Sequence, residues 1–176
     1  MLYSTYSAHV GLALLSIIAI CFEYYVISIC VGASRAKTYS AKYMAQFNEK
    51  HAEEFGTGKL APKTGLPDMG NGFFSNALSY KEWFLFNNAQ RAHYNYLENF
   101  TPTIVWIIIS LFYHPLSAAV LGFVVFIGRI IYSVGYFKTP NLRSVGAIVF
   151  DLGFIGLFVL SLVTIAKWGK VLESEN

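Results

Sequence analysis

Four long apolar runs constrain this chain more than any other feature of its sequence. They cover residues 9–32, 84–113, 116–137 and 144–168, and each has the roughly 20 residues that a helix needs to cross a bilayer. Apolar residues make up 55% of the chain and charged residues only 13%, whereas a soluble domain carries about 25% charge. We therefore predict an all-α membrane protein whose residues 1–176 form a single membrane domain.

The connections between these runs predict how the helices pack. The second and third runs are joined only by His114-Pro115, and the third and fourth by residues 138–143. Such short links favour antiparallel neighbours, and so an antiparallel four-helix bundle. The first connection, residues 33–83, is long. Its aromatic residues fall at helical spacing up to Phe55, which predicts a helical extension or an interfacial segment. The stretch 56–72 is rich in Gly and Pro and is expected to be irregular.

The basic residues predict an orientation. Nine Lys and Arg residues lie in the connections 33–83 and 138–143, against Lys167 and Lys170 on the opposite side. The positive-inside rule then places both connections in the cytoplasm. We expect an integral protein of the endoplasmic reticulum or of a mitochondrial membrane, in contact with membrane lipid. The net charge of +3 is small and forms no basic stripe, so we expect no nucleic-acid partner.

Cysteine and histidine give no indication of a disulfide or a metal. Cys21 and Cys30 lie in one run, and nine residues place them on opposite faces of a helix, about 900° apart at about 100° per residue. We expect both to pack as small apolar residues. The four histidines never fall at ligand spacing, and CxxC, HExxH, Walker, GxGxxG and GxSxG patterns are missing from the sequence. We predict no metal site.

The most informative stretch opens the second apolar run and reads FNNAQRAHYNYLEN at residues 86–99. Charged groups in or beside hydrocarbon cost several kcal/mol each, so they usually mark a working site. On a helix, Asn95 lies about 40° from Arg91, and Glu98 lies about 20° from Arg91 on its other side. Guanidinium, amide and carboxylate therefore share one narrow stripe. Such a stripe could hold a small zwitterionic ligand inside a bundle.

A second polar stripe lies in the third run. Arg129, Tyr132 and Tyr136 occupy positions i, i+3 and i+7, within an arc of about 60°. Pro140 stops or bends the helix, so Arg143 starts the fourth run near the membrane surface. Taken singly, each tyrosine is equally consistent with an interface anchor, and Arg143 with a basic residue that extends to the headgroups.

Together these segments resemble the microsomal glutathione transferase family (MAPEG), and most closely its type 3 branch. The resemblance rests on FNNAQRAHYNYLENF at 86–100, YHP at 113–115 and GRIIYSVGYFKTPNLRSVGA at 128–147. It covers residues 86–168 well. It is weaker across the first run, where Ser34-Arg35 is similar to the basic pair that ends the family's first helix.

The resemblance implies a homotrimer of four-helix protomers, with glutathione as co-substrate at the subunit interfaces. A lipophilic electrophile or a lipid hydroperoxide would be the second substrate. The family's peptide-binding positions correspond to Arg91, Asn95, Glu98, Arg129, Tyr132 and Tyr136, and more loosely to Arg35. Arg143 corresponds to the arginine that stabilises the thiolate. This agrees with residue chemistry, since Arg binds carboxylates bidentately and a nearby cation lowers the pKa of a thiol.

Two features depart from the family. The first connection is longer than in the close branch, and Glu23 and Asp151 lie within runs that should be apolar. Each carboxylate could hydrogen-bond inside the bundle, neutralise a basic residue such as Arg129, or pair with a helix of a partner protein. An alternative function therefore stays open: a MAPEG-like structural subunit of a larger membrane complex, with other membrane subunits as partners and a retained or vestigial glutathione site.

Overall fold

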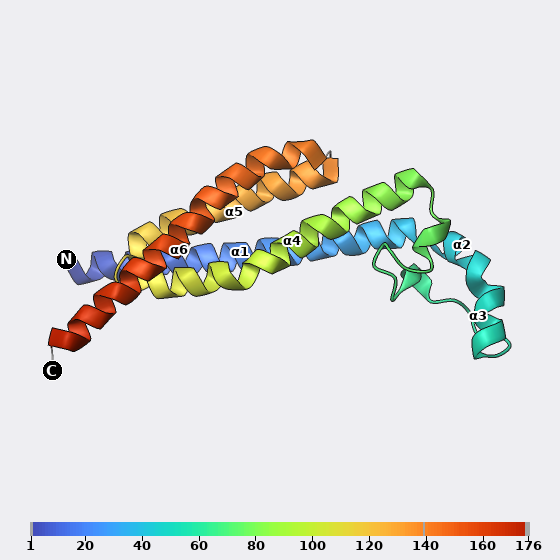
Figure 1. Cartoon of the computed structure of the whole chain (residues 1–176), viewed down its shortest axis with the longest axis horizontal. Coiled ribbons are helices and arrows are strands. Elements are labelled where there is room, and N and C mark those ends of the chain that lie inside the picture. The colour runs from blue at the N-terminus through green and yellow to red at the C-terminus, as the bar shows by residue number, and fades with distance from the viewer. Residues whose placement is uncertain (1, 139, 175–176) are drawn as a thin grey trace. The chain divides into compact units, whose positions relative to one another are not determined.

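The protein is described from a computed structural model that covers residues 2–138 and 140–174. Four long helices dominate it (Figure 1): α1 (Leu2–Thr38), α4 (Tyr80–Leu111), α5 (Pro115–Lys138) and α6 (Arg143–Ser174). The shorter elements are α2 (Ala41–Met44), η1 (Ala45–Phe47), α3 (Asn48–Phe55), η2 (Lys63–Gly65), η3 (Ser75–Ala77) and η4 (Pro140–Leu142). The described residues contain no strand, and the predicted all-α class is confirmed.

Three helical segments are long and apolar enough to cross a membrane: Thr5–Thr38, Pro115–Lys138 and Pro140–Val171. The helix α4 is as long as α6, but it carries polar and charged residues such as Arg91, Asn95 and Glu98, which lower its mean hydropathy. Its role as the fourth span stays a prediction. The helix α1 is longer than the apolar run that predicted it, because the flanking polar residues continue the helix at both ends.

The chain divides into two compact units, and each is described by itself. The first unit comprises Met1–Tyr25 and Tyr94–Asn176, and the second comprises Val26–His93. In the first unit, α1 lies against α4: the Tyr6 hydroxyl donates to the carbonyl of Phe112 at 2.7 Å, and the Tyr96 hydroxyl donates to the carbonyl of Ile20 at 3.1 Å. Small and branched side chains fill the interior, among them Ala13, Ile107, Val125 and Leu157.

The helices α5 and α6 run antiparallel and pack backbone against backbone (Figure 1). Two glycines make this approach possible. A Cβ on Gly146 would lie 2.2 Å from the backbone nitrogen of Tyr132, and one on Gly128 would lie 2.4 Å from that of Phe150. Small residues at helix interfaces permit such close contact in membranes. The spacing brings the polar stripe of α5 directly beside the start of α6.

In the second unit, residues 39–79 form a folded segment that we call the cap. Tyr39 and Met44 are buried in its core together with Phe86, the first residue of the polar stretch. The Tyr39 hydroxyl lies 2.7 Å from Ser75 Oγ, so the two ends of the cap are joined by a hydrogen bond. Residues 41–55 are helical, as the aromatic spacing predicted, but they form the separate elements α2, η1 and α3 after α1 has ended at Thr38.

Asp68 organises the irregular part of the cap. Its carboxylate accepts hydrogen bonds from the backbone N–H groups of Gly70, Gly72 and Ser75 at 2.7–2.9 Å, and from Ser75 Oγ at 2.6 Å. Burial alone would raise the pKa of Asp68, but these four hydrogen bonds outweigh burial and hold the pKa below its usual value. The loop is therefore wrapped around an ionised carboxylate.

Candidate functional site

Arg129 is the centre of the candidate site, which lies within the first unit. Its side chain is 1% exposed, although it carries a permanent charge. Nη1 donates to Asn95 Oδ1 at 2.8 Å, and Nη2 points at the carbonyl of the same residue at 3.4 Å. The α5 stripe is thereby joined to the α4 stripe at Asn95. Because Asn95 Oδ1 is occupied, its amide NH2 remains to donate elsewhere.

Aromatic rings supply the rest of the environment of Arg129. Its guanidinium carbon lies 3.6 Å from the centre of the Phe150 ring, 5.1 Å from that of Tyr96 and 5.5 Å from that of Tyr132. Cation–π contacts of this kind are worth about 2 kcal/mol or more when desolvated. They offset part of the cost of holding a charge inside a bundle, so Arg129 is held rigidly in place.

A row of side chains continues from Arg129 towards the start of α6. The rings of Tyr132 and Tyr136 meet edge to face at 5.2 Å, and both residues are buried. The Tyr136 hydroxyl accepts a hydrogen bond from Arg143 Nη1, and the guanidinium carbon of Arg143 lies 4.9 Å from the same ring. The row ends at the surface of the chain, where Arg143 is exposed.

Glu23 approaches this row from α1. It is 8% exposed, and its Oε2 accepts from the Tyr96 hydroxyl at 3.0 Å. Its Oε1 is a buried atom without a hydrogen-bond partner among the described residues. A hydrogen bond inside the bundle, one of the alternatives considered for Glu23, is therefore observed. Through Tyr96, this carboxylate supports the ring on which Arg129 rests.

Three further predicted site residues are not members of this row. Glu98 is exposed on α4 in the first unit, and Arg91 is exposed on α4 in the second unit. Arg35 belongs to the second unit, where Nη1 donates to the carbonyl of Asp68 at 2.6 Å and reaches that of Thr64 at 3.4 Å. Its guanidinium also faces the Phe86 ring at 5.1 Å. Arg35 therefore holds the cap in place.

Sequence reasoning missed two residues of the site, Tyr96 and Phe150. Tyr96 lies one position beyond Asn95, outside the stripe, and nothing in the sequence marks Phe150 among the apolar residues around it. Glu23 was marked by its charge in an apolar run. Among the described residues, no group of three His, Cys, Asp or Glu side chains could hold a metal ion.

Long membrane-type helices enclose a row of arginine, amide and tyrosine side chains, which defines a helical membrane protein with a polar site in its bundle. A model of the MAPEG family matches residues 13–165. The chain therefore belongs to the MAPEG family, whose members are membrane proteins of the glutathione transferase and peroxidase type. All the predicted site residues lie within the matched range. Assignment to the type 3 branch stays a prediction.

Proposed function

We propose that this protein is a membrane-bound glutathione transferase and peroxidase. It would activate the thiol of glutathione for attack on a hydrophobic electrophile or on a lipid hydroperoxide. The observation that carries the proposal is the continuous row from Asn95 through Arg129, Tyr132 and Tyr136 to Arg143. The row offers a fixed amide at one end and an exposed cation at the other.

The sulfur would lie at the Arg143 end of the row. A free thiol has a pKa of about 8.5 and reacts as the thiolate, and a neighbouring cation lowers that pKa to about 7.5 or below. Tyr136 accepts from Arg143, so its own hydroxyl proton remains to be donated to the sulfur. A permanent positive charge and a phenol donor together favour the thiolate over the thiol.

The peptide part of glutathione would lie towards Asn95. Its free amide NH2 suits a peptide carbonyl, and the exposed carboxylate of Glu98 suits the ammonium group. Arg129 is too deeply buried to be the main contact, and in this proposal it positions Asn95. The expected contacts of Arg91 and Arg35 with the glutathione carboxylates, and the homotrimer with sites at its interfaces, stay predictions.

Two reactions follow from such a thiolate. In the transfer reaction, the sulfur bonds to an electrophilic carbon, the leaving group departs with the bonding electrons, and the thiol proton passes to water. In the peroxidase reaction, two molecules of glutathione reduce a hydroperoxide to an alcohol and water and become the disulfide. In both, apolar helices would admit the lipophilic substrate from the bilayer.

The test is direct. The full chain would be purified in detergent, and its mass and subunit number measured by light scattering. Glutathione binding would be followed by calorimetry, with turnover tested on an aryl halide and on an organic hydroperoxide. Saturable binding with turnover in either assay supports the proposal. A well-folded trimer that neither binds glutathione nor turns over either substrate contradicts it.

A second candidate function, a structural subunit of a larger membrane assembly, is favoured by Asp151. This carboxylate is exposed on α6, between Ile148 and Leu152, which are 64% and 68% exposed. A carboxylate facing lipid near the bilayer centre costs about 2.5–3.5 kcal/mol even on the lowest scales. A basic side chain on the helix of another subunit would remove that cost. Co-purification in stoichiometric amounts with foreign membrane subunits, without glutathione binding, would favour this candidate.

A further inference from the structure

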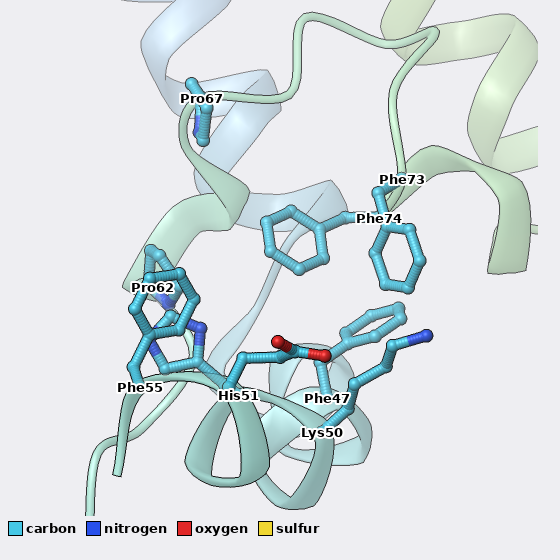
Figure 2. A pocket seen from close by; sticks show the side chains of 9 residues that line it. Phe47, Lys50, His51, Phe55, Pro62, Pro67, Phe73 and Phe74 are labelled. Carbon is cyan, nitrogen blue, oxygen red and sulfur yellow. The ribbon is translucent and has the colours of Figure 1, made fainter.

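The cap contains an apolar slot that the proposed function does not use. It has a volume of about 470 Å³, within the range of about 300–1,000 Å³ typical of small-molecule sites. Phe55, His51 and Pro62 lie on one side, and Phe47, Phe73 and Phe74 on the other (Figure 2). Both walls belong to the second unit, so the slot is defined by the cap alone.

The walls are built from rings that support one another. Phe47 packs against Phe74 with ring centres 4.9 Å apart, and His51 stacks on Phe55 at 4.4 Å. Phe55 and Phe73 nevertheless remain 68% and 56% exposed. Covering these exposed rings with an apolar ligand is favourable by about 25 cal/mol for each Å² of apolar surface removed from water.

The charge at the slot is concentrated on one side. Lys50 Nζ lies 4.8 Å from the centre of the Phe73 ring, so a cation stands at the edge of an apolar wall. Glu54 follows one helical turn later and also lines the slot. Its carboxylate repels anions, so an anionic head on an occupant would lie on the Lys50 side, beside the Phe73 ring.

The occupant must be apolar, narrow and available beside a membrane. The cap starts directly after the membrane-type segment Thr5–Thr38 and ends at Tyr80, where α4 begins. One slot between two aromatic walls suits one acyl chain, whereas a bilayer phospholipid carries two. We propose that the slot binds a single-chain lipid anion, a long-chain carboxylate whose head pairs with Lys50 and whose chain lies between the rings. This proposal is separate from the glutathione site and does not rest on it.

The experiment uses the full chain in nanodiscs with a diazirine-bearing palmitic acid as probe. After irradiation, peptide mass spectrometry locates the label. We expect saturable labelling within residues 47–55 and 73–74 that unlabelled palmitate displaces. In a Phe55→Ala/Phe73→Ala variant, whose truncated rings are exposed, affinity should fall about tenfold, or about 1.4 kcal/mol. Tyr80→Ala is the matched control, since this ring is 75% exposed and lies outside the slot.

Two further arms test the anionic head and the single chain. Lys50→Gln should weaken labelling by the acid but not by the corresponding diazirine alcohol, while Lys59→Gln, an exposed lysine outside the slot, should change neither. A two-chain phospholipid with the same diazirine should leave the slot unlabelled. Three results would overturn the proposal: labelling by the phospholipid at the same residues, labelling of wild-type protein that palmitate does not displace, or equal labelling of wild type and the double variant.

Discussion

At the scale of single residues, the site combines one buried and one exposed arginine with different tasks. Arg129 is enclosed by three rings and holds Asn95, whereas Arg143 contacts the outer end of the row through Tyr136. In the proposed function, the buried cation positions Asn95. The exposed cation can meet the charge that develops on a ligand.

Arg143→Ala should therefore impair rate more than binding. Without the cation, the pKa of the bound thiol returns from about 7.5 towards about 8.5, which lowers the thiolate fraction at neutral pH about tenfold. Turnover should fall at pH 7 and recover towards pH 9, while the dissociation constant of glutathione changes little. Arg143→Lys, which keeps the charge, is the control. A pH–rate profile of the alanine variant that coincides with wild type would exclude this role.

Glu23 offers a second test at this scale. Glu23→Gln keeps an oxygen to accept from the Tyr96 hydroxyl, but Glu23→Ala removes it and leaves that buried hydroxyl with the Ile20 carbonyl alone. The alanine variant should lose about 0.5–1.5 kcal/mol of stability, the net contribution of one hydrogen bond, because the hydroxyl keeps a second acceptor. Thermal unfolding in detergent measures this. Equal loss in both variants would show that the negative charge, and not the hydrogen bond, is what matters.

The residues that sequence patterns could identify are those whose chemistry contrasts with their surroundings. Arg129 and Asn95 stood out because polar groups are rare in apolar helices, and helical spacing correctly placed Tyr132 and Tyr136 beside Arg129 on α5. Phe150 could not be found, since an aromatic residue among apolar ones has no contrast, and Tyr96 was missed because it lies outside the stripe of Arg91, Asn95 and Glu98. The carbonyl partners of Arg35 were likewise out of reach, because an irregular loop has no periodicity from which its course can be derived.

At the scale of elements, the position of the row depends on how closely α5 and α6 approach. Gly146→Ala places a Cβ 2.2 Å from the backbone nitrogen of Tyr132, so the helices must separate. Overpacking of this kind costs about 1–3 kcal/mol, and it should also displace Tyr132 from Arg129. Gly169→Ala is the control on the same helix, because nothing lies within 4 Å of its Cβ. Thermal unfolding and glutathione calorimetry should distinguish the two variants, and an unchanged Gly146→Ala protein would contradict the close packing.

The cap should respond to acid through Asp68. Its pKa in the folded cap lies below the ordinary value of 3.8, so the unfolded segment binds the proton more readily. The contribution of this carboxylate is therefore complete above that ordinary value and is lost as pH falls through the folded-state pKa. Asp68→Asn should increase hydrogen exchange of residues 64–76 already at pH 7, because an amide presents an N–H towards backbone donors.

The matched control for the cap is Glu53→Gln, which removes an exposed carboxylate from α3. Its exchange pattern should equal that of wild type at every pH. If Asp68→Asn also matched wild type, the loop would be held by other contacts, such as those of Arg35 with the carbonyls of Asp68 and Thr64.

At the scale of the whole molecule, a substitution at Asp151 distinguishes a chain surrounded by lipid from one covered by another subunit. If α6 faces lipid there, Asp151→Asn should raise the unfolding temperature in nanodiscs, since an amide costs less than a carboxylate in hydrocarbon. If another subunit covers that face with a basic side chain, the same change should destabilise the native assembly, and a buried pair broken on one side costs about 3–5 kcal/mol. Native mass spectrometry of the assembly, run beside the unfolding measurement, separates the two outcomes.

The core of the cap has a consequence for biosynthesis. Tyr39 and Met44 are made before Phe86, yet all three belong to one buried cluster. The cap therefore cannot close while the ribosome is still translating it, and its aromatic rings remain uncovered until α4 has begun to emerge. During that interval the growing chain presents an aromatic segment, in which four lysines are balanced by four acidic residues, directly after its first membrane helix. Until α4 emerges, we expect that segment to lie in the headgroup region or to bind a chaperone that accepts aromatic side chains.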